Sequence, residues 1–493
     1  MRHDPAEAIC PGGHPLRLAI HDPAGDDSYL MRRAKIICTL GPASDRPDGI
    51  RSLIEAGMDV ARLNFSHGTH EEHVRRLESV RAAGHELGKA VGILQDLCGP
   101  KVRTGEGGPA SLANGETVRL AAGTRGADDT IAIDYERLTH SVAEGDRILL
   151  SDGAIELSVE SVVGDAILCR VEHGGPLRPR MGVNLSSGKL ELAAITEKDK
   201  VDLEFGLDAG VDFVALSFVR SARDVLSLRE LCATAAQPPR LVAKIETPAA
   251  VEEIEEIART ADAVMVARGD LGVELPPAVV PPIQKRIIDT CRTRRRPVVV
   301  ATEMLQSMVR ASRPTRAEAS DVANAIFDGA DATMLSAETA VGEDPALACR
   351  TMARIIAEAE ASPYVDPRPS PPSGKPPDSI AKAACTVAQE TGARCIVALT
   401  QTGHTGRLIS CARPQVPVLA LSPSKDTLCR LALCWGIVPH HLEFESELEL
   451  LAYRTRECVS KLGFANPGER FVMVFGSPGS AGGKTNSIRV EEA

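Results

Sequence analysis

The chain has 493 residues, of which 43% are hydrophobic and 25% charged, and its formal net charge is −11. At one compact domain per roughly 150 residues, this length predicts about three domains. The longest apolar runs fall far short of the ~18 residues of a membrane helix, and the acidic charge disfavours nucleic acid, because duplex binding rests on Lys and Arg contacts to phosphate. We therefore expect no membrane and no nucleic acid as partners.

The N-terminal extension, residues 1–31, has no continuous apolar segment and carries several acidic residues, unlike a secretory or organelle-targeting peptide. The thirteen cysteines form no Cys-x-x-Cys pair and no zinc-ligand spacing, which indicates a reducing compartment. The sequence therefore predicts a cytoplasmic protein with an extension of unknown role.

Eight short apolar runs, each followed by a stretch with helical spacing, succeed one another after the extension. They are residues 35–40, 59–65, 91–96, 212–217, 241–246, 263–267, 298–302 and 332–336. Near-continuous apolar strands separated by helices are typical of a parallel sheet buried on both faces. Eight repeats predict a closed (β/α)8 barrel of the α/β class over residues 32–104 and 185–361, and capping signals at Thr69, Thr247 and Thr315 mark its strand-to-helix turns.

Two further domains are expected. Residues 105–184, which interrupt the repeat after its third run, contain short strands and turn signals such as Asn114-Gly115, and they predict a small inserted β-barrel domain. Residues 362–378 are too rich in proline for a helix or a central strand, which predicts a linker. Residues 379–493 then predict a separate α/β domain.

The active site of such a barrel lies at the carboxyl ends of its strands. Glu246 and Asp270 end neighbouring strands, and two hard oxygen ligands at one point suit Mg²⁺. Lys244 beside them offers a fixed cation that can neutralise a phosphoryl group in transfer or a developing enolate. Structural ion pairs are the alternative for all three residues.

An anion site is predicted at the same strand ends. Gly269 lets the backbone of its turn approach an anion closely, and the Thr302 hydroxyl can donate a hydrogen bond to it. Arg62 has the planar guanidinium that clamps phosphate, with a surface ion pair as its alternative.

Seven segments, in chain order, resemble the pyruvate kinase family. They are KIICTLGPAS (35–44), NFSHG (64–68), KIE (244–246), VARGDLG (266–272), ATEM (301–304), PTRAE (314–318) and MLSAET (334–339). The resemblance implies transfer of the phosphoryl group of phosphoenolpyruvate to ADP, giving pyruvate and ATP in the last step of glycolysis. It also implies Mg²⁺ or Mn²⁺ as cofactor and a homotetramer.

The matching positions take the family's roles by this resemblance. Lys244, Arg62, Thr302 and Ser336 would be catalytic, with enolate protonation through water near Thr302 and Ser336. Substrate would contact Arg62, Lys244, Gly269, Asp270 and Thr302, and the metal would be held by Glu246 and Asp270. Nucleotide would contact Asn64, His67, Arg103 and, from the inserted domain, Asp152.

The chain departs from the family at residues 96–101. It reads DLCGPK where many members read DTKGPE and bind K⁺ through positions that match Asn64, Ser66, Asp96 and a carbonyl such as that of Leu97. Lys101 places a fixed ammonium in this neighbourhood, and at a few ångströms its field can replace that of K⁺. We therefore expect the monovalent-cation positions to be unused and K⁺ not to be required.

The segment TQTGHT (400–405) lies where family members bind the phosphate of an allosteric effector. Hydroxyls and a glycine at the start of a helix suit an anion, so the resemblance predicts a phosphorylated effector at Thr400, Thr402, Gly403 and Thr405. An ordinary capped turn is the alternative.

Two other functions stay open. A metal-dependent pyruvate or oxaloacetate aldolase on a similar barrel would also use Glu246, Asp270 and Mg²⁺, but it gives no reason for Lys244 or for the additional domains. A catalytically inactive, ligand-sensing homologue would have lost Lys244, Glu246 or Asp270, and all three are present.

Overall fold

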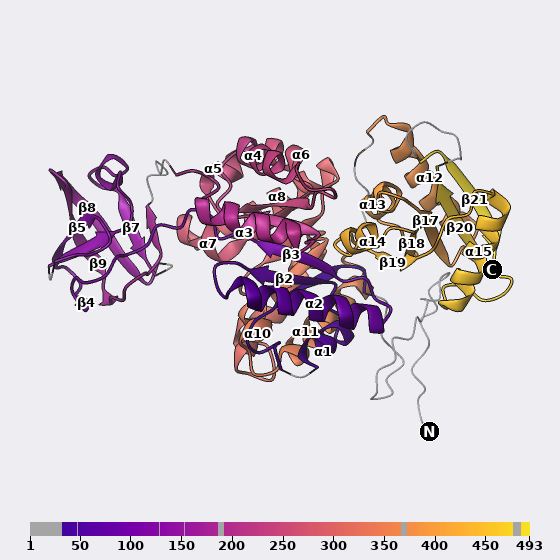
Figure 1. The fold of residues 1–493 in the computed structure, drawn as a ribbon, viewed down its shortest axis with the longest axis horizontal. Coiled ribbons are helices and arrows are strands. Elements are labelled where there is room, and N and C mark those ends of the chain that lie inside the picture. The colour runs from indigo at the N-terminus through magenta and orange to yellow at the C-terminus, as the bar shows by residue number, and fades with distance from the viewer. Residues whose placement is uncertain are drawn as a thin grey trace, which may run out of the picture.

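The computed structural model describes residues 32–46, 48–127, 129–151, 153–185, 192–365, 371, 373–476 and 485–493. The N-terminal extension, Asp152 and part of the predicted linker lie outside the described residues. Three bodies follow one another along the long axis of the molecule, with the inserted β sheet at one end, the barrel in the middle and the C-terminal domain at the other end (Figure 1). In the described part of the chain, every helix is too short or too polar to span a bilayer.

The eight predicted strands form a closed parallel barrel, which confirms the predicted fold class. Around the barrel the order is β1-β16-β15-β14-β13-β12-β3-β2. The strands are β1 (Lys35–Thr39), β2 (Val60–Asn64), β3 (Gly92–Asp96), β12 (Phe213–Leu216), β13 (Arg240–Ile245), β14 (Ala263–Ala267), β15 (Val298–Ala301) and β16 (Ala332–Leu335). Nearly all of their residues are buried, because helices cover the outer face and side chains fill the interior.

Three helices of the barrel begin at the predicted caps. The helices of the barrel are α1 (Gly49–Glu55), α2 (His70–Glu86), α3 (Glu197–Asp208), α4 (Ala222–Cys232), α5 (Pro248–Glu252), α6 (Ile254–Thr260), α7 (Arg268–Glu274), α8 (Val280–Arg294), α9 (Arg316–Phe327), α10 (Ala337–Ala340) and α11 (Pro345–Ala361). Capping boxes at Thr69 and Thr315 start α2 and α9, and Thr247 caps α5 with Pro248 in its first turn.

The inserted segment forms a six-stranded sheet with the order β11-β7-β8-β9-β5-β6 and its own apolar core. Its strands are β5 (Thr117–Ala122), β6 (Thr130–Ile133), β7 (Arg147–Leu150), β8 (Ile155–Val163), β9 (Ala166–His173) and β11 (Val183–Leu185), and β4 (Ser111–Leu112) pairs with β10 (Gly175–Pro176). Isolated bridges join Arg103 to Gly182 and Thr104 to Ile133, so the entering segment lies between the two edge strands of this half-barrel. Strand β11 ends at Leu185, one residue beyond the predicted end of the insertion.

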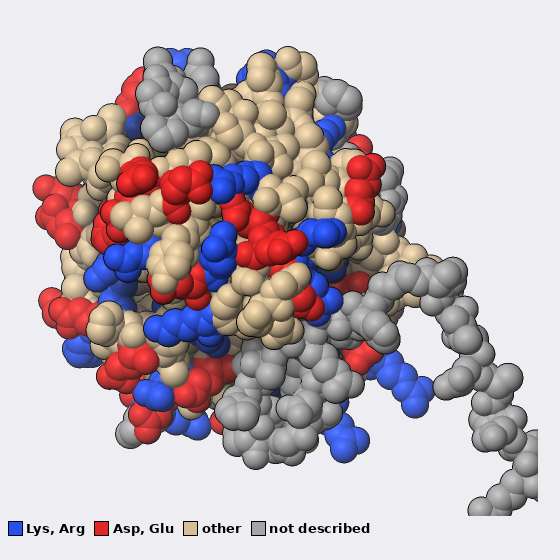
Figure 2. All heavy atoms as spheres, turned by 90° about the vertical axis from the view of Figure 1, so that its right-hand side faces the viewer, with Lys and Arg blue, Asp and Glu red and all other residues tan. Residues whose placement is uncertain are grey.

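The C-terminal domain is a five-stranded sheet with the order β19-β18-β17-β20-β21. Its elements are α12 (Pro376–Glu390), β17 (Cys395–Leu399), α13 (His404–Cys411), β18 (Val418–Ser422), α14 (Lys425–Leu431), β19 (Ile437–His441), α15 (Leu448–Lys461), β20 (Arg470–Phe475) and β21 (Ser487–Glu492). The prediction that 376–378 belong to the linker is wrong, because Pro376 and Pro377 occupy the first turn of α12, where a missing N–H is tolerated. On the end face of the molecule, acidic and basic side chains are interspersed (Figure 2).

The C-terminal domain is bonded to the amino-terminal ends of the barrel strands. The ammonium of Lys35, the first residue of β1, donates to the Ile437 carbonyl at 2.7 Å, and Gly436 N donates to the Arg33 carbonyl at 2.8 Å. Arg413 pairs with Asp331 at 3.0 Å and stacks over Trp435. The opposite end of the barrel therefore faces away from this domain and carries the carboxyl ends of the strands.

Candidate active site

A buried chain of alternating charges crosses the carboxyl ends of β2, β3 and β13. The Lys244 Nζ lies 2.9 Å from Glu246 Oε1 and 3.3 Å from Asp96 Oδ1, and Arg62 Nε donates to Asp96 Oδ2 at 2.7 Å. Lys244 Nζ also donates to the hydroxyl of Ser217 at 2.7 Å. All five side chains are buried, so their geometry is fixed by packing and pairing.

Charge pairing decides the direction of the pKa shifts of Lys244 and Asp96 in this chain. Burial acts against the charged form of Lys244, but Asp96 and Glu246 outweigh it and raise the pKa of the ammonium above its ordinary value. Burial likewise opposes ionisation of Asp96, yet Lys244 and Arg62 together lower the pKa of that carboxyl. Lys244 is therefore a permanently charged group at the barrel mouth.

The two carboxylates that the sequence assigns to Mg²⁺ lie near each other. Burial raises the pKa of Glu246, and the charge of Asp270 adds to this rise against the pull of Lys244. Asp270, in α7, is partly exposed, and the Lys101 Nζ lies 3.7 Å from its Oδ1. Repelling carboxylates at an open mouth fit Mg²⁺, which takes one or two protein carboxylates and completes its shell with water and substrate oxygens. Among the residues that the structure describes, no group of three or more His, Cys, Asp and Glu side chains is arranged to hold a metal ion.

Gly269 and Thr302 come together as the sequence predicts. The Gly269 N–H donates to the Thr302 hydroxyl at 2.7 Å, and that hydroxyl donates to the Ala301 carbonyl at 2.6 Å. Thr302 has a φ of 71° and Glu303 a φ of 56°. A β-branched residue in the left-handed region is strained, and such strain is concentrated at functional sites. The guanidinium of Arg268 supports the turn by donating to the Thr302 carbonyl at 2.8 Å.

Two buried residues with no assigned role hold this mouth in place. The Ser217 hydroxyl accepts from Lys244 and donates to the Leu97 carbonyl at 2.7 Å. Glu338 accepts from Ser336 N at 2.7 Å and from Leu305 N at 3.0 Å, so it ties the loop after β15 to the loop after β16. Ser217 is the last residue of one predicted strand and Glu338 lies just after another, and this position at a strand end was the one signal in the sequence.

The described residues expected on the nucleotide side, Asn64, His67 and Arg103, lie at the rim of the barrel mouth. Asn64 is paired in register with Asp96, and its Oδ1 accepts from Ser66 N at 3.2 Å. The His67 carbonyl contacts the imidazole of His73 at 3.0 Å. Arg103 donates to the Arg180 carbonyl at 3.1 Å, at the base of the inserted sheet.

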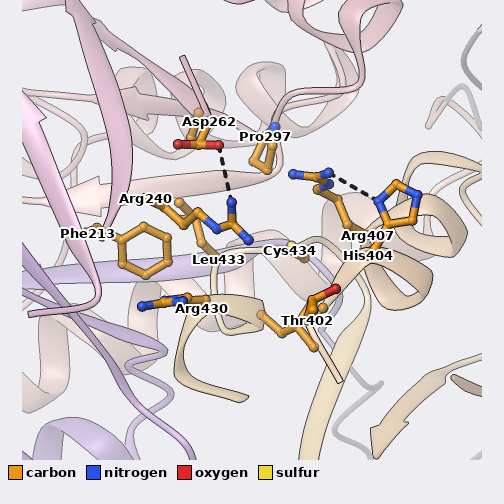
Figure 3. Close-up of a pocket in the computed structure, with 13 residues that line it drawn as sticks. Phe213, Arg240, Asp262, Pro297, Thr402, His404, Arg407, Arg430, Leu433 and Cys434 are labelled. Carbon is orange, nitrogen blue, oxygen red and sulfur yellow. Dashed lines mark hydrogen bonds and ion pairs between the residues drawn. The ribbon is translucent and has the colours of Figure 1, made fainter. Parts of the chain in front are cut away.

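The four residues expected to bind an effector phosphate are divided between two places. Thr400 and Thr405 are buried, and the Thr405 hydroxyl is hydrogen-bonded to that of Thr485 at 2.8 Å. Thr402 and Gly403 instead line a cavity at the start of α13 (Figure 3), where Gly403 has a φ of 82°.

Comparisons with known proteins match one family along most of the chain. The family model described as "Pyruvate kinase, barrel domain" matches residues 31–349, and "Pyruvate kinase, alpha/beta domain" matches residues 378–491. A pyruvate kinase of Agrobacterium vitis is 44% identical over 467 residues, covering 93% of this chain and 96% of its own. One of Mycobacterium tuberculosis H37Rv is 43% identical over 468 residues, covering 94% and 98%. The solved structure of a pyruvate kinase from Cryptosporidium parvum has a TM-score of 0.88 at 34% identity and covers 95% of this chain and 97% of its own.

Proposed function

The chain belongs to the pyruvate kinase family and is a phosphotransferase, and we propose that its barrel mouth transfers the phosphoryl group of phosphoenolpyruvate to ADP, giving pyruvate and ATP. The observation that carries this proposal is the buried ammonium of Lys244 between Asp96 and Glu246. A preorganised cation in a site of low dielectric stabilises a phosphoryl group in transfer far better than one in water.

The substrate's anionic groups would each have a partner. Arg62 would bind the phosphoryl oxygens, while the Gly269 backbone and the Thr302 hydroxyl, which are 2.7 Å apart, would hold the carboxylate. Glu246 and Asp270 would hold Mg²⁺ or Mn²⁺, which when bound would neutralise charge on the substrate's oxygens. After transfer, water near Thr302 and Ser336 would protonate the enolate.

The inserted domain, residues 105–184, would act as a lid on the nucleotide side, with Asn64, His67 and Arg103 on the rim and Asp152 in the lid. Arg103 supports this role, because its contact with the Arg180 carbonyl joins the two ends of the inserted segment. Closure of such a lid excludes water during phosphoryl transfer.

We also propose that K⁺ is not required. Asp96, a position that binds K⁺ in many relatives, has Arg62 and Lys244 as fixed cations within 3.3 Å, and the Leu97 carbonyl accepts from Ser217. Lys101 lies 3.7 Å from Asp270 and adds a further fixed charge at the mouth. The homotetramer and the phosphorylated effector at the 400–405 turn also stay proposals, which light scattering and effector titration would test.

A coupled assay tests the reaction. Pyruvate formed from phosphoenolpyruvate and ADP is measured with a lactate dehydrogenase, with ATP measured separately. The proposal requires pyruvate and ATP in equal amounts. Pyruvate release from oxaloacetate without nucleotide would instead support an aldolase, and no turnover of either substrate by folded protein would support an inactive homologue.

A further inference from the structure

The loop that follows β2, residues 65–68, carries His67 on the rim of the barrel mouth. Ser66, His67 and Gly68 are exposed, whereas the Phe65 side chain is buried beneath them. Exposed connecting segments are ordinarily more mobile than the elements they join. A loop that must hold a ligand-binding group in one position therefore needs support from residues that do not touch the ligand.

The backbone N–H groups of this loop are bonded to the strand ends beside it. Phe65 N donates to the Asp96 carbonyl at 3.0 Å. Ser66 N donates to the Asn64 side chain at 3.2 Å, and His67 N donates to the Asn64 carbonyl at 3.1 Å. The carbonyls of Phe65 and His67 are bonded instead by side chains of two helices on the barrel wall, and these two contacts fix the loop to the helices.

His73, near the start of α2, supports the carbonyl of His67. Its Nε2 lies 3.0 Å from that oxygen, and because a carbonyl can only accept, Nε2 carries the proton. His73 is only 2% exposed, and its ring stacks on Phe65 with 4.2 Å between centroids and 17° between planes. One imidazole therefore fixes both the buried side chain of Phe65 and the backbone of the exposed His67.

The other ring nitrogen of His73 shows what histidine adds at this position. Nδ1 is buried and has no partner among the described residues. Burial lowers the pKa of His73 against the opposing effect of its bond to the His67 carbonyl, and the charge of Arg76 lowers it further. A phenylalanine would fill the same space and stack on Phe65 without burying an unpaired nitrogen. The specific contribution of histidine is therefore its hydrogen bond to the loop.

Gly68 lets the loop approach this imidazole. Its φ is 81°, in the left-handed region that favours glycine. A Cβ at Gly68 would lie 3.3 Å from His73 Nε2 and 2.9 Å from Glu72 Oε2. A larger residue would push the loop away from His73, so glycine is required here both for the backbone conformation and for the close approach.

Helix α3 supports the second carbonyl. Lys198 Nζ donates to the Phe65 carbonyl at 2.9 Å and pairs with Asp202 one turn further along α3. Asp202 is buried and also lies 2.7 Å from the Nε2 of His70, so it links α3 to α2, its neighbour on the outside of the barrel (Figure 1). The His70 ring stacks on Phe205 of α3 with 4.2 Å between centroids. The loop therefore rests on two helices that are joined to each other beside it.

We propose that His73 and Lys198 are positioning residues for nucleotide binding, which hold Asn64 and His67 in place on the rim without contacting the nucleotide themselves. This inference rests on the proposed function, in which Asn64 and His67 contact ADP. A loop that is ordered before the ligand arrives spares the entropy cost of ordering it on binding. Loss of either support should therefore weaken the binding of ADP more than that of phosphoenolpyruvate, whose proposed partners do not include this loop.

Two substitutions at His73 separate the hydrogen bond from ring packing. His73→Phe keeps a ring on Phe65 but removes the donor, whereas His73→Gln keeps an N–H donor near the position of Nε2 but removes the ring. We expect His73→Phe to raise KM for ADP about 10-fold and His73→Gln only about twofold, with KM for phosphoenolpyruvate and kcat within about twofold in both. His85→Phe, at an exposed histidine in the last turn of α2, should change none of these constants.

Lys198→Met tests the second support and decides the question if His73→Phe does not fold. The Lys198 side chain is 59% exposed, so its replacement leaves the core intact. We expect KM for ADP to rise about fivefold through loss of the charged hydrogen bond to the Phe65 carbonyl. Lys200→Met, at an exposed lysine of the same helix, is the matched control and should leave KM for ADP unchanged.

Amide hydrogen exchange tests the support in the absence of nucleotide. Peptides that cover residues 63–70 should exchange about 10-fold faster in His73→Phe and in Lys198→Met than in the unaltered protein. Unchanged exchange and an unchanged KM for ADP would overturn the inference. Faster exchange with an unchanged KM for ADP, or an equal rise in KM for both substrates, would also overturn it, because the two residues would then stabilise the fold alone.

The same variants distinguish this inference from the proposed function. If the unaltered protein failed to turn over phosphoenolpyruvate and ADP, the proposed function would fall. Calorimetric titration with ADP alone would then decide the inference, since weaker ADP binding in His73→Phe than in His73→Gln supports the positioning role and equal binding in the two variants overturns it.

Discussion

Lys101 and Asp270 face each other at the barrel mouth, with 3.7 Å between the Lys101 Nζ and the Asp270 Oδ1. Lys101 belongs to the segment that leads from β3 into the inserted domain, whereas Asp270 lies in α7 beside the buried Lys244–Glu246 pair. This ion pair places a fixed positive charge beside the proposed metal ligands and gives the first prediction its physical basis.

Replacement of K⁺ by tetramethylammonium should leave the rate of the unaltered enzyme within about twofold. Lys101→Glu should lose about tenfold in rate without K⁺ and recover when K⁺ is added, because a carboxylate beside Asp270 needs a mobile cation; tenfold corresponds to ~1.4 kcal/mol. Steady-state rates in the two salts measure this. Lys461→Glu, an exposed charge reversal at the end of α15, serves as control. A collapse of the unaltered enzyme's rate in tetramethylammonium would contradict the prediction.

Lys244→Met should abolish phosphoryl transfer, with a fall in kcat of about 10³-fold or more, because the cation that faces the transferring group is gone. The variant should also be less stable by about 3–5 kcal/mol, since Glu246 loses its buried partner. Mn²⁺ binding, followed by electron paramagnetic resonance, should persist through Glu246 and Asp270. Near-normal turnover would refute the role of Lys244, and Lys200→Met, at an exposed lysine of α3, is the matched control.

Ser217→Ala should reduce kcat by about tenfold with little change in KM for phosphoenolpyruvate. The hydroxyl accepts from the Lys244 ammonium and donates to the Leu97 carbonyl, both at 2.7 Å, so its loss frees the cation to move. The comparison variant is Ser79→Ala, which removes an exposed helix hydroxyl. A lower melting temperature with unchanged kcat would assign Ser217 a purely structural role.

Glu338→Gln should destabilise the protein by about 1–3 kcal/mol, because an amide cannot accept from both Ser336 N and Leu305 N as the carboxylate does. Glu343→Gln, at an exposed position that follows α10, should be neutral. Denaturant unfolding of both variants measures the difference. Equal stability of the two variants would show that the carboxylate contributes nothing to these loops.

The sequence predicts the barrel well because its strands are local features. Each apolar run is short, three of the eight are followed by capping signals, and the pattern alone places Lys244, Glu246, Asp270 and Thr302 at strand ends that must converge in a parallel barrel. Local rules also explain the wrong boundary of the linker. Prolines that look like a linker are equally suited to the first turn of α12, and the pattern of residues 376–378 cannot separate the two.

The tertiary structure decided which side chains contact one another in the site. Asp96 between Arg62 and Lys244, the Ser217 hydroxyl beneath that ammonium and Glu338 between two loops are contacts that join segments far apart in the chain. The cavity at the start of α13 is a further example, because it is lined by Arg240, which ends no apolar run, and by Arg430, which lies in another domain. The sequence by itself determined which strands form and which chemistry their ends carry, since periodicity and residue type are local. Which charged side chains meet was decided only by closure of the barrel and docking of the domains. Closure and docking both depend on side-chain packing between segments that are distant in the chain.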